Sequence, residues 1–461
     1  GNFVVCHAHR MRRHSWPRCA GRIPRLVSVA ALSGIARIGE SPRCAGGACR
    51  LVSVAAVSSM ARIGETRLRA TFFGVAARTA VALGATHGHG DTCRNDECKS
   101  PSASSPGLRS VEDFALSARR AALSRRPPPV FVCGNEAGDL DTIVSSLTYA
   151  YARDMAAYTN AAAQMLDPIV FVPIMPFPRA DFRLRRDAQM LFREAGFRMD
   201  AEGAPEALLF WDEVDWAALG PPSSLRVILC DHNRMSAALS ERFGDVMAIV
   251  DHHRDEGLYP EATRLLDESV GSCCSLVTSE LAAIVGPAGG PKDIGTLLLG
   301  TILVDTRNFN QREKRFSGVD EAALDRLQTF VACGRDEPAM QDLYERLMDA
   351  RGNTFGLSVH DLLRLDYKEA EVSARATRVG FSAIADTMDN FVSRAGGPNS
   401  ALTALHRFAD ARHVSLLFCA TNVAMLEEGE WRKSLVVVER GTTGDDLVED
   451  IWQLLRGREG M

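Results

Sequence analysis

The sequence contains no long hydrophobic run and no dense cysteine framework. Without a run of about 18 apolar residues free of charge, a transmembrane helix is not expected, and no membrane is predicted as a partner. The 12 cysteines are spread over 461 residues, whereas secreted disulfide scaffolds are usually short and rich in cysteine. Cys133, Cys230, Cys273 and Cys274 lie in apolar runs, so we expect them to be buried and reduced.

Lysine is absent from the first 70 residues, and acidic residues are nearly so. This segment has twelve arginines and two glutamates, which give it a charge of +10. Because the whole chain has a net charge of −5, the remaining residues must carry −15. An acidic body of this kind argues against a broad nucleic-acid-binding surface, so nucleic acid is not expected as a partner. An enzyme with this charge that acts on polyanions must keep its cations close to the site.

Residues 1–107 are predicted to be an arginine-rich extension and linker. Residues 18–40 recur as residues 43–65, but two copies are too few for a solenoid, which needs about three. Three explanations stay open. The nearly acid-free composition resembles an organelle transit peptide, the first residue other than Met fits a gene-model artefact or a fragment, and a functional domain is the third. We expect a cytoplasmic protein, or a mitochondrial or plastid one if residues 1–70 are a transit peptide.

Four short apolar runs further along the chain each lead into an aspartate. A short aliphatic run bounded by polar residues is typical of a strand buried in a parallel sheet. Alternation of such strands with helices, the first expected at 142–155, predicts a doubly wound, mostly parallel α/β domain over residues 108–335. The runs and the polar residues after them are 130–133 with Asn135, Asp139 and Asp141; 227–230 with Asp231; 247–250 with Asp251, His252 and His253; and 297–304 with Asp305.

This pattern predicts a site for divalent metal ions. In parallel sheets, functional groups gather past the carboxyl ends of the strands, so five carboxylates and two imidazoles would converge. A lone aspartate after a strand is commonly a turn or helix-cap residue, but four in order are harder to explain that way. Carboxylates this close need cations between them. Oxygen-rich ligation favours Mn²⁺ or Mg²⁺ over Zn²⁺.

The spacing favours two metal ions rather than one. Asp139 and Asp141 are two residues apart, so both can face one centre while they bind different ions. Two metal ions about 3.5–4 Å apart serve displacement at phosphorus, because they hold the attacking and the leaving oxygen. The sequence therefore predicts metal-assisted hydrolysis of a phosphoester or phosphoanhydride.

Six motifs, taken in order, resemble the DHH phosphoesterase superfamily, and within it the eukaryotic exopolyphosphatases and the related prune proteins. The likeness covers residues 125 to 461. It implies a smaller α/β C-terminal DHH-associated domain over residues 336–461, with the active site in the cleft between the domains. The motifs are GNEAGDLDT (134–142), CDHN (230–233), IVDHHRDEGLY (249–259), GSCCSLV (271–277), LLLGTILVDTRN (297–308) and LLRLDYKE (362–369).

The resemblance also implies a set of metal ligands. Asp231 would bridge the two ions, Asp139 would bind the first, and the other ligands would bind the second. A hydroxide held by the metals would attack the phosphorus, because coordination lowers the pKa of water. The implied ligands are Asp139, Asp141, Asp231, His252 and Asp305.

Three further residues are implied to take part in catalysis. Asp251 would orient the neighbouring imidazole or a metal-bound water. His253 would face the scissile phosphate and either stabilise it or protonate the leaving oxygen. Asn135 stands where the related pyrophosphatases have a histidine. Because an amide oxygen is a weak ligand, the first metal site should be looser than theirs, which disfavours a dedicated pyrophosphatase.

Lys368, Arg364 and Arg440 are the candidates for binding substrate phosphates. A phosphate chain needs fixed lysine and arginine groups across from the metals. Lys368 and Arg364 belong to the motif at 362–369, and Arg440 follows a strand-like run at 434–438. An ordinary charge pair at a helix end would explain the first two equally well without the resemblance.

The function favoured by these expectations is release of terminal phosphate from inorganic polyphosphate. Three alternatives stay open: a prune-like hydrolase of short polyphosphates or nucleotides, an inorganic pyrophosphatase, and a prune-like protein that mainly binds protein partners. An exonuclease of the same superfamily would need a GGGH-type motif, whereas residues 441–446 read GTTGDD. Preferred chain length, resting metal and oligomeric state are not predicted.

Overall fold

The computed structural model describes twelve segments of the chain. Within them, six parallel strands form one sheet in the order β6-β5-β4-β7-β8-β9. The strands predicted at 130–133, 227–230 and 247–250 are confirmed as β4, β7 and β8. The described segments are residues 3–8, 36–37, 49–54, 109–124, 129–164, 169–286, 289–328, 330–331, 338–372, 377–421, 424–426 and 430–439. The strands are β4 (Val130–Cys133), β5 (Phe171–Met175), β6 (Leu209–Phe210), β7 (Arg226–Cys230), β8 (Asp245–Asp251) and β9 (Thr263–Leu266).

The strand order of this sheet reverses between β4 and β7. The chain leaves β4, adds β5 and β6 on one side, and then returns to add β7, β8 and β9 on the other. In doubly wound sheets such a reversal opens a crevice beyond the carboxyl ends of the two strands. The predicted doubly wound α/β fold is therefore confirmed, and its topology places the ends of β4 and β7 side by side.

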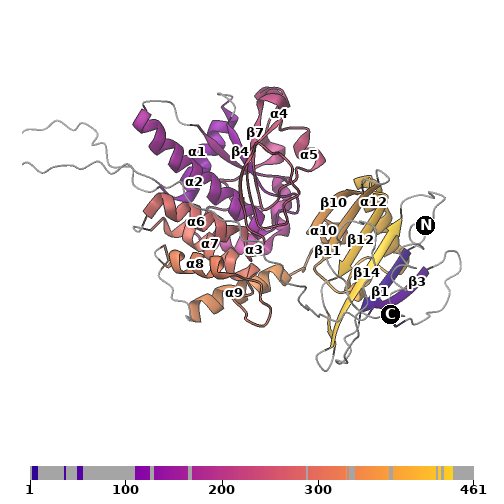
Figure 1. The fold of residues 1–461 in the computed structure, drawn as a ribbon. Coiled ribbons are helices and arrows are strands. Elements are labelled where there is room, and N and C mark those ends of the chain that lie inside the picture. Colours follow the sequence, from indigo (N-terminus) through magenta and orange to yellow (C-terminus); the bar gives the residue numbers. More distant parts are fainter. Residues whose placement is uncertain are drawn as a thin grey trace, which may run out of the picture. The chain divides into compact units, whose positions relative to one another are not determined.

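Helices flank this sheet. Figure 1 shows α1 and α2 on one side of β4, with α4 and α5 on the other. The helix predicted at 142–155 is confirmed within α2. The helices are α1 (Val111–Leu123), α2 (Leu140–Gln164), α3 (Arg186–Glu194), α4 (Trp216–Leu219), α5 (Ala237–Ser240), α6 (Cys273–Val285), α7 (Lys292–Asp305), α8 (Gly318–Leu327) and α9 (Pro338–Gly352), with short 3-10 helices at η1 (Arg179–Leu184), η2 (Trp211–Glu213) and η3 (Pro222–Ser224).

The prediction of a strand at 297–304 is wrong, because these residues lie in the helix α7. All residues from Ile294 to Val304 are buried. A helix that is buried on every side shows no helical periodicity, so its apolar run cannot be told from that of a buried strand. Pro291 before the helix and Asp293 in its first turn were the signals of a helix start.

Gly300 shows how closely α7 packs against its neighbours. A Cβ atom added at this residue would lie 2.5 Å from Leu191 Cδ1 on α3 and 3.2 Å from Leu347 Cδ1 on α9. The missing side chain therefore makes room for both leucines. This packing fixes the C-terminal end of α7, where Asp305 is the last residue.

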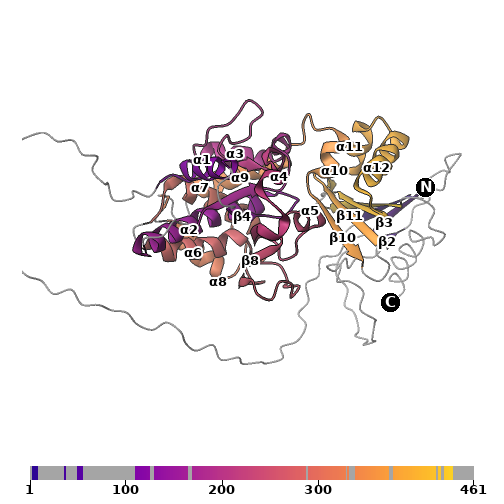
Figure 2. The ribbon, with the colours of Figure 1, turned by 90° about the horizontal axis from the view of Figure 1, so that it is seen from above.

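A second sheet contains the described strands of the C-terminal part. β10 pairs with β11 and β12 with β14 in antiparallel fashion, whereas β11 and β12 are parallel. Figure 2 shows α10, α11 and α12 on one side of this sheet, where they share its apolar core. The elements are α10 (Val359–Arg364), β10 (Tyr367–Val372), β11 (Thr377–Ile384), α11 (Met388–Arg394), α12 (Pro398–Arg412), β12 (Leu416–Thr421), β13 (Ala424–Leu426) and β14 (Glu430–Glu439).

Strands from the N-terminal extension continue this sheet. β1 (Phe3–Ala8) pairs antiparallel with β14, β3 (Cys49–Val54) pairs with β1, and β2 (Ala36–Arg37) pairs with β3. The domain boundaries at residues 107/108 and 335/336 stay predictions. The sequence also predicts a last helix at 445–456, and these residues lie outside the described part of the chain. Among the described helices, none combines the length and the apolar character needed to cross a membrane.

Candidate metal centre

The loop after β4 brings two aspartates to the start of α2. Asp139 Oδ1 accepts a hydrogen bond from the Thr142 N–H at 3.0 Å, so its carboxylate caps the helix. Asp141 lies in the first turn and is 5% exposed. The free N–H groups of a helix N-terminus favour negative charge, which helps to hold both carboxylates there.

Asp231 follows β7 in a left-handed backbone conformation, with a φ of 60°. Few residues other than glycine, asparagine and aspartate adopt this conformation at low cost. The Asp231 N–H donates to Val250 O at 2.9 Å, which ties the turn to β8. Its Oδ2 atom accepts hydrogen bonds from Thr142 Oγ1 at 2.6 Å and from Asn135 Nδ2 at 2.9 Å. The carboxylate is thereby aimed at the end of β4.

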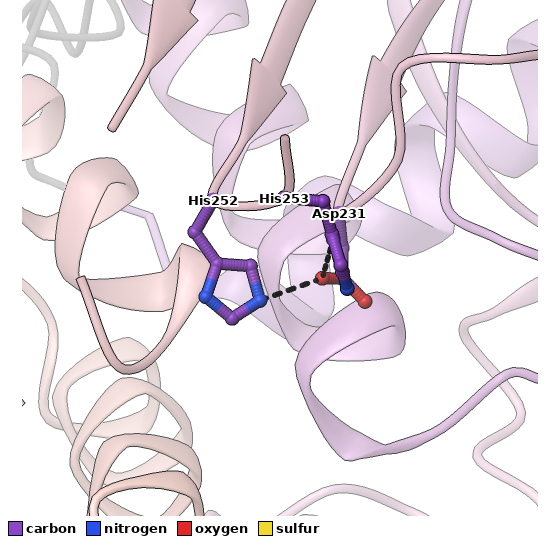
Figure 3. A group of neighbouring side chains, drawn as sticks. All are labelled: Asp231, His252 and His253. Atoms are coloured by element: carbon purple, nitrogen blue, oxygen red, sulfur yellow. Dashed lines mark ion pairs between the residues drawn. The ribbon is translucent and has the colours of Figure 1, made fainter. Parts of the chain in front are cut away.

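Both imidazoles at the end of β8 point toward the Asp231 carboxylate (Figure 3). His252 Nε2 lies 3.2 Å from Asp231 Oδ1, and His253 Nδ1 lies 3.7 Å from the same atom. The three residues can offer one ligand atom each, all within 4.8 Å of one another. Ligand atoms at this spacing can reach a shared metal ion.

Asp141 is held by the N-terminus of α6. Its Oδ2 accepts from the Cys273 N–H at 2.7 Å, and its Oδ1 accepts from the Cys274 N–H and from Ser272 Oγ, each at 3.0 Å. His252 Nε2 lies 3.7 Å from Asp141 Oδ2. The motif at 271–277 therefore supplies donors to a metal-site carboxylate, a role that the sequence did not predict for it.

Asp251 is fully buried and binds the backbone and the side chain that follow it. Its Oδ1 lies 2.8 Å from His253 Nδ1 and accepts the backbone N–H groups of His252 and His253. Its Oδ2 accepts from Asn233 Nδ2 at 2.6 Å. Burial opposes the charge on this carboxylate, but the hydrogen bonds from His253 and Asn233 hold its pKa below the ordinary value. This geometry suits the predicted orienting role.

The carboxylate of Asp305 shows whether the residues present can hold a cation. Its Oδ2 atom is buried and has no hydrogen-bond partner within the described part of the chain. Burial, and then the charge of Asp141, raise the pKa of Asp305 well above its ordinary value. A buried carboxylate oxygen without a donor is costly, and a bound cation would remove that cost. The residues present therefore fit a metal ion.

The charges of the other carboxylates indicate the same need. Burial, and then Asp231, raise the pKa of Asp141, while burial and then Asp139 raise the pKa of Asp231. Burial would lower the pKa of His252, but the hydrogen bond with Asp231 and the charge of Asp141 raise it instead. Burial and mutual repulsion thus oppose the ionised forms of Asp141 and Asp231, and a bound cation would favour them.

Asn135 presents its amide nitrogen to the site. Its Nδ2 donates to Asp231 Oδ2, while its Oδ1 accepts from the Ala137 N–H at 3.0 Å. The second bond fixes which end of the amide faces Asp231. In this arrangement Asn135 holds the carboxylate of Asp231 in place, and its oxygen is already bonded. The predicted roles of Asn135 and of the metal ligands stay predictions.

Lys368 on β10 is electrostatically linked to the candidate ligands. Burial would lower its pKa, but the carboxylates of Asp139, Asp366 and Asp231 raise it. Burial would raise the pKa of Asp139, but the positive charge of Lys368 is the largest of the influences that lower this pKa below its ordinary value. Lys368 therefore stays charged near Asp139, as a phosphate-binding residue should.

Arg364 is engaged elsewhere in the structure. Its Nη1 donates to Asp181 Oδ1 at 2.5 Å, and its Nη2 donates to Asp361 Oδ1 at 2.8 Å. To bind a phosphate, its guanidinium would have to leave these carboxylates. Its predicted role stays a prediction, and this pairing weighs against it. The third candidate, Arg440, lies outside the described residues.

Arg351 is a cation near the site that the sequence analysis missed. It lies in the last turn of α9, with its Nε atom 3.8 Å from Asp187 Oδ2. Burial opposes its charge, but Asp187, Asp305 and Asp139 together raise its pKa. Outside any motif, one arginine in an arginine-rich chain gives no signal, so only the fold reveals its place.

Comparison with known proteins gives two family matches. The DHH family, N-terminal domain, matches residues 129–304, and the DHHA2 domain matches residues 345–457. The exopolyphosphatase PRUNE1 of Rattus norvegicus is 30% identical over 289 residues, which cover 62% of this chain and 58% of the rat protein. A Schizosaccharomyces pombe protein with a provisional exopolyphosphatase name is 25% identical over 368 residues, covering 77% of this chain and 87% of that protein.

A third relative has a metal in its name. The manganese-dependent inorganic pyrophosphatase of Methanothrix thermoacetophila is 22% identical over 262 residues, which cover 56% of this chain and 71% of that protein. Against the mammalian relatives named PRUNE1 from rat, human and mouse, the chain spans 58% to 63% of their length. Both family matches and the exopolyphosphatase names of the PRUNE1 proteins and the Schizosaccharomyces pombe protein agree with the resemblance seen in the motifs.

Proposed function

Because residues 129–304 match the DHH family and residues 345–457 match the DHHA2 domain, we propose that the chain is a metal-dependent hydrolase that releases terminal phosphate from inorganic polyphosphate. The observation that best supports this is the meeting of Asp141, Asp231 and His252 beyond the ends of β4 and β7. Asp305 interacts electrostatically with Asp141, and its Oδ2 atom has no hydrogen-bond partner among the described residues. A set of buried carboxylates with one imidazole suits hard divalent cations. The exopolyphosphatase names of two relatives favour polyphosphate as substrate.

The cofactors in this proposal are two divalent ions, Mn²⁺ or Mg²⁺. When bound, they would neutralise phosphate oxygens and lower the pKa of the attacking water. The chain would orient them through the donors that hold each carboxylate, such as Thr142 Oγ1 on Asp231 and the Cys273 N–H on Asp141. The residues proposed to hold them are Asp139, Asp141, Asp231, His252 and Asp305.

His253 is proposed to supply a proton to the leaving phosphate. Its Nδ1 atom, 2.8 Å from Asp251 Oδ1, holds its proton on the side of that buried carboxylate. The hydrogen bond that His253 donates to Asp251 raises the pKa of His253, which favours the protonated ring. A second proton on Nε2 can then pass to the leaving oxygen, and the half-exposed ring is open to substrate.

Positively charged side chains close to the metal centre would bind the substrate. The body of the protein is acidic, so a polyphosphate is repelled except where fixed positive charge faces it. Lys368 meets this requirement, because it remains charged next to Asp139.

The test of this function is phosphate release by the full chain with Mn²⁺ or Mg²⁺. Long-chain polyphosphate would be compared with pyrophosphate, a cyclic nucleotide and a short RNA. We expect polyphosphate to be hydrolysed, and hydrolysis to stop on chelation of the metal. Rapid turnover of pyrophosphate with polyphosphate untouched would instead support a pyrophosphatase, as the name of the Methanothrix thermoacetophila relative suggests. A folded, metal-loaded chain without any turnover would support the role of binding a protein partner.

Replacing Lys368 by alanine should raise the KM for polyphosphate roughly 10- to 100-fold, with a smaller change in kcat. The lost contact is one charge-assisted hydrogen bond, worth about 1.5–3 kcal/mol. Replacing Arg364 by alanine should leave KM unchanged and lower the free energy of unfolding, since Asp181 and Asp361 lose a partner. Steady-state kinetics and urea unfolding measure both. A raised KM in Arg364→Ala would restore the phosphate-binding role predicted for it.

A further inference from the structure

Arg185 is a buried cation that binds the backbone of the loop between β4 and α2, which carries Asp139. It lies between η1 and α3 and is 5% exposed. Its guanidinium donates to Ala137 O at 2.6 Å, to Gly138 O and to Asp181 O at 2.9 Å. The guanidinium carbon also stands 3.9 Å from the centre of the Phe177 ring. All of these acceptors are backbone carbonyls, and two of them immediately precede Asp139.

Such burial is unfavourable for the arginine itself. Burial lowers the pKa of Arg185 to about 10, although the charges of Asp181, Asp139 and Asp187 act in the opposite direction. A buried charge is tolerated only when several groups compensate it. Carbonyl dipoles and one aromatic face do so here. The arrangement therefore stabilises one conformation of the loop at a cost to the side chain that maintains it.

Gly138 makes this arrangement possible. Its φ is +59°, and a Cβ atom at this residue would lie 2.3 Å from Phe177 Cε1 and 2.9 Å from Arg185 Nε. The ring and the guanidinium thus occupy the space where a side chain would be. Together, Gly138, Phe177 and Arg185 fix the peptide that leads into Asp139.

We propose that Arg185 is a positioning residue that sets the metal affinity of Asp139. Arg185 holds the carbonyl of Gly138 on one side of Asp139, and the Thr142 N–H holds its Oδ1 on the other. With both anchors in place, the carboxylate has one orientation before a metal arrives. This inference rests on the proposed ligation of metal by Asp139.

The planar guanidinium is suited to this task in a way that lysine is not. Two of its nitrogens reach the carbonyls of consecutive residues, Ala137 and Gly138, at the same time. An ammonium group is a compact charge and cannot span both in a fixed geometry. Arg185→Lys therefore keeps the positive charge and removes the fixed geometry.

Arg179 offers a matched control. Its guanidinium carbon lies 4.4 Å from the centre of the Phe210 ring, and its guanidinium donates to Leu208 O at 2.8 Å and to Pro205 O at 3.2 Å. Like Arg185, it therefore combines contact with an aromatic ring and hydrogen bonds to backbone carbonyls. It also pairs with Glu213 and Asp200. None of these partners belongs to the candidate metal centre. Arg179→Lys should therefore destabilise the fold and leave metal binding as it was.

The experiment is a titration of Mn²⁺ into the full-length protein by isothermal calorimetry, with thermal unfolding of the metal-free protein beside it. Arg185→Lys and Arg185→Gln should weaken one of two Mn²⁺-binding events roughly 10- to 100-fold, as loss of an outer support of a ligand usually does. Arg179→Lys should lower the Tm alone. Wild-type Mn²⁺ affinity in folded Arg185→Lys would overturn the inference.

Asp139→Ala separates this inference from the proposal beneath it. If Asp139→Ala loses a Mn²⁺-binding event and Arg185→Lys does not weaken one, the positioning role of Arg185 fails and the ligand assignment stands. If Asp139→Ala binds Mn²⁺ like the wild type, the ligand assignment itself fails, and with it the reason for Arg185 to act on metal affinity.

Discussion

Asp231→Asn is expected to leave a folded protein that releases no phosphate. The loss should exceed the ~100-fold that removal of an outer support of a metal ligand costs, because Asp231 is proposed to bridge both ions. Asparagine tolerates the left-handed backbone at this position, so the turn after β7 should persist. An asparagine oxygen can still accept the hydrogen bond from Thr142 Oγ1.

The same variant should respond differently to metal. Burial, and then the charge of Asp139, make the ionised form of Asp231 unfavourable, so the metal-free variant should unfold at the wild-type Tm or above it. Mn²⁺ at a thousand times its Kd should stabilise the wild type by about 4 kcal/mol and should stabilise the variant far less. Differential scanning fluorimetry and a phosphate-release assay would measure both effects.

Asp245→Asn is the control for this experiment. Asp245 is exposed at the first residue of β8, so the same chemical change occurs at the opposite end of a strand of the same sheet. We expect it to change neither phosphate release nor the response to Mn²⁺. Full activity in Asp231→Asn would exclude Asp231 as a bridging ligand.

Asp320→Ala should lower the free energy of unfolding by at least about 3 kcal/mol. The carboxylate is fully buried and accepts hydrogen bonds from the N–H of Gly271 at 2.9 Å, from Ser275 Oγ at 2.7 Å and from the N–H of Ser317 at 2.8 Å. Alanine would leave these donors without their acceptor, at about 1–3 kcal/mol for each buried group. Urea unfolding with a constant m value would give the difference.

The loss should extend to the metal centre. Gly271 and Ser275, which donate to Asp320, flank the three residues that donate to Asp141. Asp320 therefore supports the carboxylate of Asp141 by holding the segment 271–275 in place. Asp320→Ala should therefore also weaken Mn²⁺ binding at a temperature where the variant is folded. Asp320 forms a capping box with Ser317 at the start of α8, and Asp361 forms one with Ser358 at the start of α10. Asp361→Ala should therefore lower the free energy of unfolding without an effect on Mn²⁺ binding. Equal stability of Asp320→Ala and the wild type would contradict the network.

The sequence predicted the sheet well because its signals are local. The run at 130–133 is apolar at every position and is followed at once by glycine and polar residues, which matches a short strand buried on both faces. The same reasoning failed at 297–304, where a helix buried on every side has the same composition. Only Pro291 before the helix and Asp293 in its first turn distinguished the two.

The candidate site was predictable in its members and less so in their contacts. Which carboxylates meet follows from the strand order, because Asp141 and Asp231 lie at the adjacent ends of β4 and β7. The direction in which an amide turns does not follow from sequence, so the bond of Asn135 Oδ1 to the Ala137 N–H had no signal. The same holds for Arg185, since its partners are backbone atoms that every residue possesses.

The backbone of Asp231 also limits how this position can change in evolution. With a φ of 60°, it suits aspartate, asparagine and glycine and disfavours nearly every other residue. Asparagine codons differ from those of aspartate by a single base at the first position. On the role proposed for Asp231, a single base change would therefore yield a chain that keeps its fold and releases no phosphate. A catalytically silent paralogue would then lie one nucleotide away from this sequence.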